Sequence, residues 1–425
     1  MAKYQQFIFK RWAFEAEKKT LTCTYSYDDE LEFNETFTFD FEIVDFNVAA
    51  FKRAADNLFF IAGVSYYKAF LAPTIKVEFG AIDQAHAAFY SKTYQKGLGE
   101  FFYINKLDPL TTVNFPINSD PITPVTANST GLLVGLGGGK DSLVSIELLQ
   151  DQDITTWSLG HKQQLQPLAE AVGRNHLWVE RAWDPQIQAL NAKGAYNGHV
   201  PISAIFAAVG TITAILSGKR DVVVSNERSA DEPTLEYNGV SINHQYSKSS
   251  EFEKDYQAIL AAGFGESQRY YSLLRPLSEL RIAELFAKTG FEKYKGVFSS
   301  CNRAFTKASN QIFWCGECPK CAFVFLILTP FVERSSLEAL FGKNLLLEPA
   351  LTPTYEQLLG IAGEKPLECV GEILESRTAM EMAKQHYPEL AVYSYELPDQ
   401  YNYASLEAHL VPANIYESIE TSLTA

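Results

Sequence analysis

The feature that most constrains this fold is a glycine-rich turn that joins an apolar run to a helical segment. The apolar run covers residues 132–134, the turn reads GLGGG at 135–139, and the helical pattern covers 141–149. Consecutive glycines let backbone N–H groups converge on an anion without Cβ atoms in the way, and the start of a helix adds partial positive charge and unpaired donors. The order of strand, turn and helix therefore predicts a phosphate-binding site in an α/β sheet.

Short apolar runs alternate with helical patterns from this turn onward. The expected strands are residues 132–134, 154–159, 177–179 and 222–224. The expected helices include residues 141–149 and 202–216. Such alternation is typical of a parallel sheet built from βαβ units, with ligands bound outside the carboxyl ends of its strands. Polar residues that follow the strands are therefore candidates for the functional site.

Two further parts flank the α/β pattern, since a chain of 425 residues is too long for one ordinary core. Residues 1–125 are rich in Phe and Tyr, alternate between apolar and polar residues at 32–41 and show helical spacing at 47–70. These patterns predict a separate α+β domain with antiparallel strands. The α/β domain is expected to cover residues 126–330, and residues 331–425 to form a mainly helical C-terminal region.

The charge balance limits what the chain can bind. Its 36 Lys and Arg against 51 Asp and Glu give a net charge of −15, which disfavours broad contact with nucleic acid or with an anionic membrane surface. The first residues lack the apolar core of a signal peptide, and the apolar run 322–328 is too short to span a bilayer. We therefore expect a cytoplasmic protein whose partners are small molecules, with its oligomeric state left open.

Two common phosphate loops do not fit the turn. A Walker A loop requires Ser or Thr after its Lys, but Asp141 follows Lys140, and a dinucleotide fingerprint requires Gly where Lys140 stands. The remaining pattern, GGKDS after a strand, resembles the PP-loop of the ATP pyrophosphatase superfamily, whose sheet domain is of the adenine nucleotide α-hydrolase type. In that superfamily a Ser more often occupies the place of Gly137, so one hydroxyl contact with phosphate is missing here. A turn that merely permits tight packing is the structural alternative.

The PP-loop resemblance implies an ATP site. By this resemblance, Gly138, Gly139 and Ser142 hold the departing pyrophosphate of ATP. Lys140 offsets the growing charge, and Asp141 helps to place Mg²⁺. The residues expected to bind the nucleotide are thus Gly137, Gly138, Gly139, Lys140, Asp141 and Ser142.

Three polar segments lie where strands are expected to end. Residues 225–229 read SNERS, 243–249 read NHQYSKS, and 273–277 read LLRPL as a strand end and turn before a helical pattern. The candidate substrate ligands are Asn226, Arg228 and Arg275. The candidate catalytic residues are Asp141, Glu227, His244, Tyr246 and Lys248. A solvated loop and a surface ion pair are the structural alternatives for the second and third segments. His161 and His199 are weaker candidates, for which structural roles are expected.

Four of the six cysteines fall close together, where residues 315–321 read CGECPKC. The set consists of Cys301, Cys315, Cys318 and Cys321. Tetrahedral Zn²⁺ takes four soft ligands at a structural site, so we expect structural zinc, with an iron–sulfur cluster as the alternative. A redox or sulfur-carrying role ranks below these, because a metal would hold the apolar helical segment 322–332 that follows. Cys23 and Cys369 stand apart from the set.

The quoted motifs together resemble the UDP-N-acetylmuramoyl-L-alanyl-L-glutamate epimerases of the MurL type. The resemblance rests on GGGKDS, SNERS, NHQYSKS, LLRPL and CGECPKC, from the glycine-rich turn through Cys321. It implies an ATP- and Mg²⁺-dependent isomerase of peptidoglycan precursor synthesis. Its substrates would be ATP and the UDP-muramyl dipeptide, whose terminal L-Glu becomes D-Glu through an acyl adenylate, with release of AMP and pyrophosphate.

The implied reaction needs an activated carboxylate. Removing the α-proton beside a free carboxylate would add negative charge to an anion, and the acyl adenylate removes that obstacle. One or two bases must then lie near the α-carbon. His244, Tyr246 and Lys248 are the candidates for this work, while Arg228 and Arg275 would bind carboxylates or phosphates of the substrate.

Other functions stay open on the sequence alone. The PP-loop synthase that makes the nitrile precursor of queuosine also combines this loop with a late four-cysteine zinc site, but it lacks a large N-terminal domain of this kind. A tRNA thiolase is disfavoured by the acidic balance and by the lack of an obvious RNA-binding stripe. A nucleotide-binding regulator stabilised by zinc is the non-enzymatic alternative.

Overall fold

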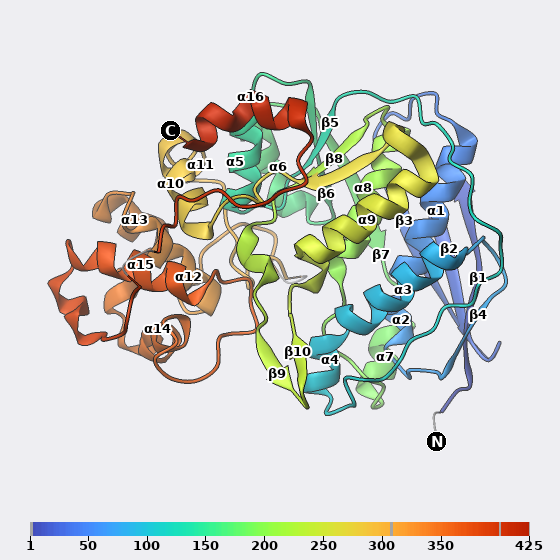
Figure 1. Cartoon of the computed structure of the whole chain (residues 1–425), viewed down its shortest axis with the longest axis horizontal. Helices are drawn as coiled ribbons and strands as arrows, with labels where there is room; N and C mark the ends of the chain where they lie inside the picture. The colour runs from blue at the N-terminus through green and yellow to red at the C-terminus, as the bar shows by residue number, and fades with distance from the viewer. Residues whose placement is uncertain (1–2, 307–308, 399–400, 425) are drawn as a thin grey trace.

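Nine strands form one sheet within the residues that the computed structural model describes, 3–306, 309–398 and 401–424 (Figure 1). Five neighbouring strands are parallel, in the order β11 (Arg269–Ser272), β8 (Asp221–Val224), β5 (Leu132–Gly135), β6 (Ile154–Leu159) and β7 (His176–Ala182). The sheet continues with β3 (Leu31–Asp40), β2 (Thr20–Tyr27), β1 (Gln6–Glu15) and β4 (Thr74–Val77). The molecule is a mixed α/β protein with a large, mostly parallel sheet, as the sequence pattern predicts.

The N-terminal strands extend the sheet of the parallel strands. β3 pairs antiparallel with β7, and Phe39 lies opposite Val179. Phe33, Phe37 and Phe39 are fully buried, whereas Glu32 and Asn34 are exposed, so the alternation in the sequence does mark a strand with one face in the core. The boundary expected near residue 125 therefore separates two parts of one sheet rather than two sheets.

A buried ion pair fastens the junction between β3 and β7. Arg181 Nε lies 2.7 Å from Glu35 Oε1, and both side chains are almost fully buried. Arg181 also donates a hydrogen bond to the Ser65 hydroxyl at 2.8 Å. Burial raises the pKa of Glu35 although the cation of Arg181 opposes this shift. Removing either partner would leave an unpaired charge in the core.

Helices cover both faces of the sheet (Figure 1). One face carries α1 (Val48–Ala62), α3 (Gln84–Gly97), α8 (Ile202–Leu216) and α9 (Ser250–Phe264). The other carries α5 (Lys140–Leu148), α6 (Lys162–Val172) and α10 (Glu279–Thr289). Leu133 of β5 belongs to the first core, and its neighbours Leu132 and Val134 belong to the second. A strand buried on both faces explains why this part of the sequence reads as continuous apolar runs.

The C-terminal part is helical and packs on the second core. Its central helix, α12 (Pro319–Leu328), is buried from Lys320 to its end and contacts α10 and α15 (Ile373–Lys384). The other helices of the C-terminal part are α13 (Arg334–Phe341), α14 (Thr352–Leu358) and α16 (Ala413–Thr424). Earlier in the chain lie the short helices α2 (Val64–Tyr67), α4 (Gly99–Ile104), α7 (Gln186–Ala192) and α11 (Phe291–Tyr294), and the hairpin of β9 (Leu235–Tyr237) and β10 (Val240–Ile242). Within the described ranges, every helix is too short or too polar to cross a bilayer.

Most expected elements of the parallel sheet are confirmed. The expected strand 154–159 and helix 202–216 coincide with β6 and α8, and the other expected elements differ only at their ends. The interpretation of 273–277 as a strand end is wrong, because β11 stops at Ser272 and these residues form the turn before α10. The turn still lies at the carboxyl end of a parallel strand, which keeps its polar residues near the functional edge of the sheet.

We expect Arg181→Ala to lower the free energy of unfolding by about 3–5 kcal/mol, because Glu35 would stay buried without its cation. Urea denaturation followed by tryptophan fluorescence measures this change. Lys18→Ala, in the exposed pair with Glu15, is the control and should cost less than about 1 kcal/mol. An equally small loss for Arg181→Ala would contradict a structural role for the buried pair.

Candidate active site

A cavity of about 370 Å³ opens where β5, β6 and β8 end. Its wall includes the glycine-rich turn after β5, the segment after β8 and the start of α8. The first turn of α12 and the loop before α15 complete it from the C-terminal part of the chain. Open parallel sheets bind ligands at this edge, and the volume is in the range of small-molecule sites.

The glycine-rich turn contributes Gly137, Gly139 and Ser142 to the cavity wall. Gly139 is the N-cap of α5, so the first unpaired N–H groups of this helix lie at the cavity. Gly138 has a φ of +95°, and a Cβ atom there would lie 2.6 Å from the Phe305 ring. Glycine is therefore required at position 138, whereas a Cβ atom at Gly137 would meet nothing within 4 Å.

Lys140 is buried beside the cavity and is absent from its wall. Its ammonium group binds the carboxylates of Asp141 and Glu279. Burial lowers the pKa of Lys140, but the two carboxylates outweigh burial and the pKa is raised. Among the described residues of the wall, the lysines are Lys248 and Lys320. Nothing in the sequence pattern marks Lys320, which stands between two cysteines of CPKC.

Carboxylates gather around this buried lysine. One carboxylate oxygen from each of Asp141, Glu227 and Glu279 lies within 4.8 Å of the others. Asp141 reaches the cavity wall, and the other two side chains are buried. Burial raises the pKa of Glu279, while at Asp141 the charges of Lys140 and Lys320 outweigh burial and lower the pKa. Oxygen donors of this kind suit Mg²⁺. Glu279 is the first residue of α10 and belongs to none of the motifs recognised in the sequence.

The segment after β8 places Asn226 on the cavity wall but directs Arg228 elsewhere. Arg228 begins the 3₁₀ turn η1 (Arg228–Asp231). Its guanidinium donates to the Tyr401 hydroxyl and to the Glu407 carboxylate, each at 3.0 Å. Arg228 therefore joins the C-terminal segment to the edge of the sheet.

Arg275 is buried, with 2 % of its surface exposed, and its donors are used within the protein. Its guanidinium donates to the Glu253 carboxylate at 3.1 Å. It also donates to the carbonyl of Glu227 at 2.6 Å and to the carbonyl of Lys248. Arg275 thus holds the backbone of two other candidate residues, and its place in the structure is that of a positioning residue.

The segment 243–249 sends its candidate side chains to different places. Lys248, in the 3₁₀ turn η2 (Tyr246–Lys248), lines the cavity. The His244 ring binds Glu100, and its centroid lies 4.6 Å from that of the His199 ring. Tyr246 is buried and lines another cavity, between α3 and the β9–β10 hairpin. The structure therefore brings Lys248, and not Tyr246, to the glycine-rich turn.

A cysteine outside every motif, Cys369, lies on the cavity wall. Lys248 Nζ donates a hydrogen bond to Cys369 Sγ at 3.1 Å. Lys320 Nζ donates to the carbonyl oxygen of Cys369, and the Lys320 backbone N–H donates to Glu368 at 3.0 Å. Both lysines of the wall therefore bind one short loop, and an isolated Cys gave no signal that could place it there.

The four clustered cysteines meet at the start of α12. Their sulfur atoms lie within 4.8 Å of one another, and Cys315 Sγ is 3.7 Å from Cys321 Sγ. Cys318 is the N-cap of α12 and accepts a hydrogen bond from the Cys321 N–H at 3.4 Å. Thiolates around one tetrahedral Zn²⁺ would lie roughly 3.8 Å apart. The expected cluster, which includes Cys301, is thus confirmed as a set that fits one metal ion, and the same helix start carries Lys320.

Two family models together match most of the chain. Residues 1–273 match the family model of the MurL N-terminal domain, and residues 297–393 match that of the MurL C-terminal domain. The chain belongs to the MurL family. The first match spans the N-terminal and the parallel strands together, and the second contains the four clustered cysteines and Cys369.

Curated MurL relatives cover most of the chain. The UDP-N-acetyl-alpha-D-muramoyl-L-alanyl-L-glutamate epimerase of Xanthomonas oryzae pv. oryzae is 40% identical over 383 residues, 88% of this chain and 84% of the relative. Proteins of the same name from Micromonospora sp. and Salinispora tropica are 41% and 38% identical, over 84% and 90% of this chain and 80% and 85% of the relatives. The resemblance read from the motifs is confirmed, and the chain is an enzyme of the isomerase class, an epimerase.

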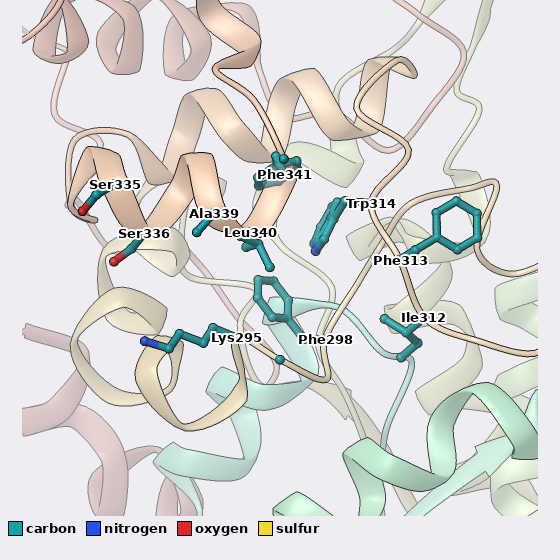
Figure 2. A pocket seen from close by; sticks show the side chains of 12 residues that line it. Lys295, Phe298, Ile312, Phe313, Trp314, Ser335, Ser336, Ala339, Leu340 and Phe341 are labelled. Carbon is teal, nitrogen blue, oxygen red and sulfur yellow. The ribbon is translucent and has the colours of Figure 1, made fainter.

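A larger cavity, of about 710 Å³ (Figure 2), shares no lining residue with the cavity at the glycine-rich turn. It lies between α13, the segment 312–314 and the residues after α11, and Phe298, Trp314 and Leu340 face it. Among the described residues that line it, Lys295 is the one with an ionisable side chain. Acid–base chemistry needs more than a single amine, so the smaller cavity at the glycine-rich turn is the better candidate of these two.

We expect Gly138→Ala to destabilise this MurL family member by about 1–3 kcal/mol, because the left-handed backbone and the Phe305 ring both oppose a Cβ atom. Gly137→Ala is the matched control and should stay within about 0.5 kcal/mol of the unchanged protein. Thermal unfolding followed by circular dichroism compares the two variants. Equal stability of both would contradict the geometry of the turn.

Proposed function

We propose that the chain is an ATP-dependent epimerase that inverts the terminal L-Glu of UDP-N-acetylmuramoyl-L-Ala-L-Glu and releases AMP and pyrophosphate. The names of the MurL relatives support the substrate. One observation supports the use of ATP: the start of α5, two lysines and a group of carboxylates lie together at one edge of the cavity. Backbone N–H donors, ammonium groups and carboxylates with Mg²⁺ are what bind nucleoside triphosphates.

The glycine-rich turn is a PP-loop in this proposal. A carboxylate oxygen of the substrate attacks the α-phosphorus of ATP, the bond to pyrophosphate breaks, and an acyl adenylate forms. Backbone N–H groups of residues 137–139 and the Ser142 hydroxyl bind the departing pyrophosphate. The missing Ser at Gly137 leaves these backbone donors in place.

The lysines that face the anions differ from the one in the motif. Lys140 is already paired with Asp141 and Glu279, whereas Lys248 and Lys320 line the cavity. We assign the negative charges of ATP and of the adenylate to these two lysines. Lys140 then acts by holding the carboxylates in place.

Asp141, Glu227 and Glu279 are the residues that would hold Mg²⁺. Lys140 neutralises only part of their charge, so the group keeps a net affinity for a cation. When bound, Mg²⁺ would polarise phosphate oxygens and stabilise the charge that develops on pyrophosphate. This assignment gives Glu227 a role in binding the cation rather than in moving a proton.

Asn226 is the proposed polar contact of the substrate, since it lies on the cavity wall beside the glycine-rich turn. Arg228 and Arg275 act one step away from the substrate. Arg275 holds the carbonyl of Lys248, and Arg228 holds the C-terminal segment through Tyr401. Substrate binding should therefore weaken indirectly when either arginine is changed.

The adenylate makes the second half of the reaction feasible. It removes the negative charge beside the α-carbon, so the electron pair of the broken C–H bond moves into a neutral acyl group. After reprotonation on the opposite face, water attacks the acyl carbon and AMP leaves. Of His244, Tyr246 and Lys248, only Lys248 is among the described residues of the cavity wall.

The proposed substrates also support a location in the cytoplasm, because ATP and nucleotide-linked precursors are metabolites of that compartment.

The direct test incubates the purified protein with ATP, Mg²⁺ and UDP-N-acetylmuramoyl-L-Ala-L-Glu. Chromatography measures AMP, and chiral analysis after hydrolysis measures the configuration of Glu. D-Glu formed together with AMP is the expected result. AMP formed only with another carboxylate would keep the activation chemistry and exclude this substrate, and no AMP with any carboxylate would favour a nucleotide-binding regulator.

We expect Asp141→Asn and Ser142→Ala each to reduce substrate-dependent AMP formation at least about 100-fold, because each removes a group that meets the charged phosphates or Mg²⁺. Asp151→Asn, at an exposed position after α5, is the control and should keep full activity. Circular dichroism checks that the variants are folded. Full activity in both variants would exclude the PP-loop assignment.

The four-cysteine cluster supports structural Zn²⁺, because four thiols so close together leave no room for the sulfide and iron ions of a cluster. We expect one zinc per chain by elemental analysis, and its loss in Cys318→Ser. Loss of the metal should also reduce activity, because α12 carries Lys320 to the cavity. Cys23→Ser, in β2, is the control and should retain the metal. Iron and sulfide in the purified protein would contradict this assignment.

A further inference from the structure

The loop before α15 brings a thiol to the cavity that the proposed reaction uses. Cys369 shares the cavity wall with Asp141, Ser142 and Asn226. In the sequence it follows all of the motifs and belongs to none of them. Hydrogen bonds fix the loop on both sides of the sulfur atom: Lys320 binds the Cys369 carbonyl and the Glu368 side chain. The thiol is therefore held at the cavity and is part of the same bonded group as the two lysines.

Cations surround the sulfur atom. Lys248 Nζ donates to Cys369 Sγ at 3.1 Å, and the His244 ring and Lys320 also face this residue. Burial raises the pKa of the Cys369 thiol, but Lys248, His244 and Lys320 outweigh burial and lower it to about 6. At His244, burial lowers the pKa, but the bonds to Cys369 and Glu100 outweigh it and raise the pKa to about 9. The hydrogen bond from Lys248 and the neighbouring His244 ring thus favour the thiolate form of Cys369.

Few other groups at the cavity can accept a proton. The described ionisable residues of its wall are Asp141, Lys248, Tyr270, Lys320 and Cys369. Lys248 has a raised pKa, since Cys369 and Glu227 outweigh burial, and burial raises the pKa of Tyr270, so both stay protonated at neutral pH. Asp141 is bound to Lys140 and belongs to the proposed Mg²⁺ ligands. Among these described residues, Cys369 is therefore the remaining candidate to accept a proton from the substrate.

We infer that Cys369 is the catalytic base that takes the α-proton from the glutamyl adenylate, an inference that rests on the proposed function. The C–H bond breaks, an S–H bond forms, and the electron pair moves into the acyl carbonyl to give an enolate. Lys248 and Lys320, on the same wall, stabilise the charge on the enolate oxygen. Water supplies the proton that forms the new C–H bond on the opposite face, and the thiol returns its proton to solvent.

The test separates activation of the substrate from proton transfer. Exchange of labelled pyrophosphate into ATP, in the presence of UDP-N-acetylmuramoyl-L-Ala-L-Glu, reports the adenylate. Chiral analysis of Glu and α-deuterium incorporation in D₂O report removal of the α-proton. We expect Cys369→Ala and Cys369→Ser to keep pyrophosphate exchange within about threefold and to lose both proton readouts by roughly 10²–10⁴-fold. Cys23→Ala, whose thiol lies in β2 and outside the cavity wall, should keep all three readouts.

Each other outcome has a definite meaning. Substrate-dependent exchange absent from the unchanged protein would count against the proposed function itself. Normal D-Glu formation by Cys369→Ala, or equal loss of exchange and epimerisation in a Cys369→Ser variant that melts at the normal temperature, would overturn the inference about Cys369 alone. A substrate adduct on Cys369 in the intact mass of the quenched enzyme would also overturn it, because the sulfur would then be a nucleophile.

Discussion

The parallel pairing of β5 with β6 on one side and β8 on the other fixes the position of the glycine-rich turn. Because the strand is bonded along both edges and covered on both faces, the turn that follows it has a fixed starting point. That turn needs glycine at position 138 to pass Phe305, and it ends at the N-cap of α5. The pairing thereby places backbone donors at the same edge as Asn226, which follows the neighbouring strand β8.

The C-terminal part completes this edge through α12. The four cysteines gather at the start of the helix, Cys318 caps it, and its first turn carries Lys320 to the cavity. Lys320 in turn binds the loop that holds Cys369. A structural metal in the four-cysteine cluster would therefore act on the chemistry at a distance, because the position of the helix start decides where a lysine and a thiol lie.

The charge distribution of the cavity differs from that of the whole chain. The net charge of −15 disfavours polyanions over the surface, whereas Lys248 and Lys320 make the cavity wall locally cationic. The carboxylates of Asp141, Glu227 and Glu279 gather beside these lysines, and Lys140 binds those of Asp141 and Glu279. Cations beside carboxylates suit the reaction that we propose, in which ATP phosphates bind together with Mg²⁺ and the substrate carboxylate is converted to an uncharged acyl adenylate.

The local features of this protein can be predicted from its amino-acid sequence alone. Short apolar runs, the glycines at 135–139 and the spacing of CGECPKC depend on neighbouring residues, so they predicted the parallel strands, the turn and the cysteine cluster. Only the tertiary structure decided which side chains meet. Pairing of β3 with β7 joined the N-terminal strands to the sheet, and burial turned Lys140 and Arg275 away from the cavity. Packing of α10 brought Glu279 to Lys140, and packing of the C-terminal helices brought Lys320 and Cys369 to the cavity. These residues are far apart along the chain and carry no local pattern, because the contacts that give them a role form only when separate elements pack together.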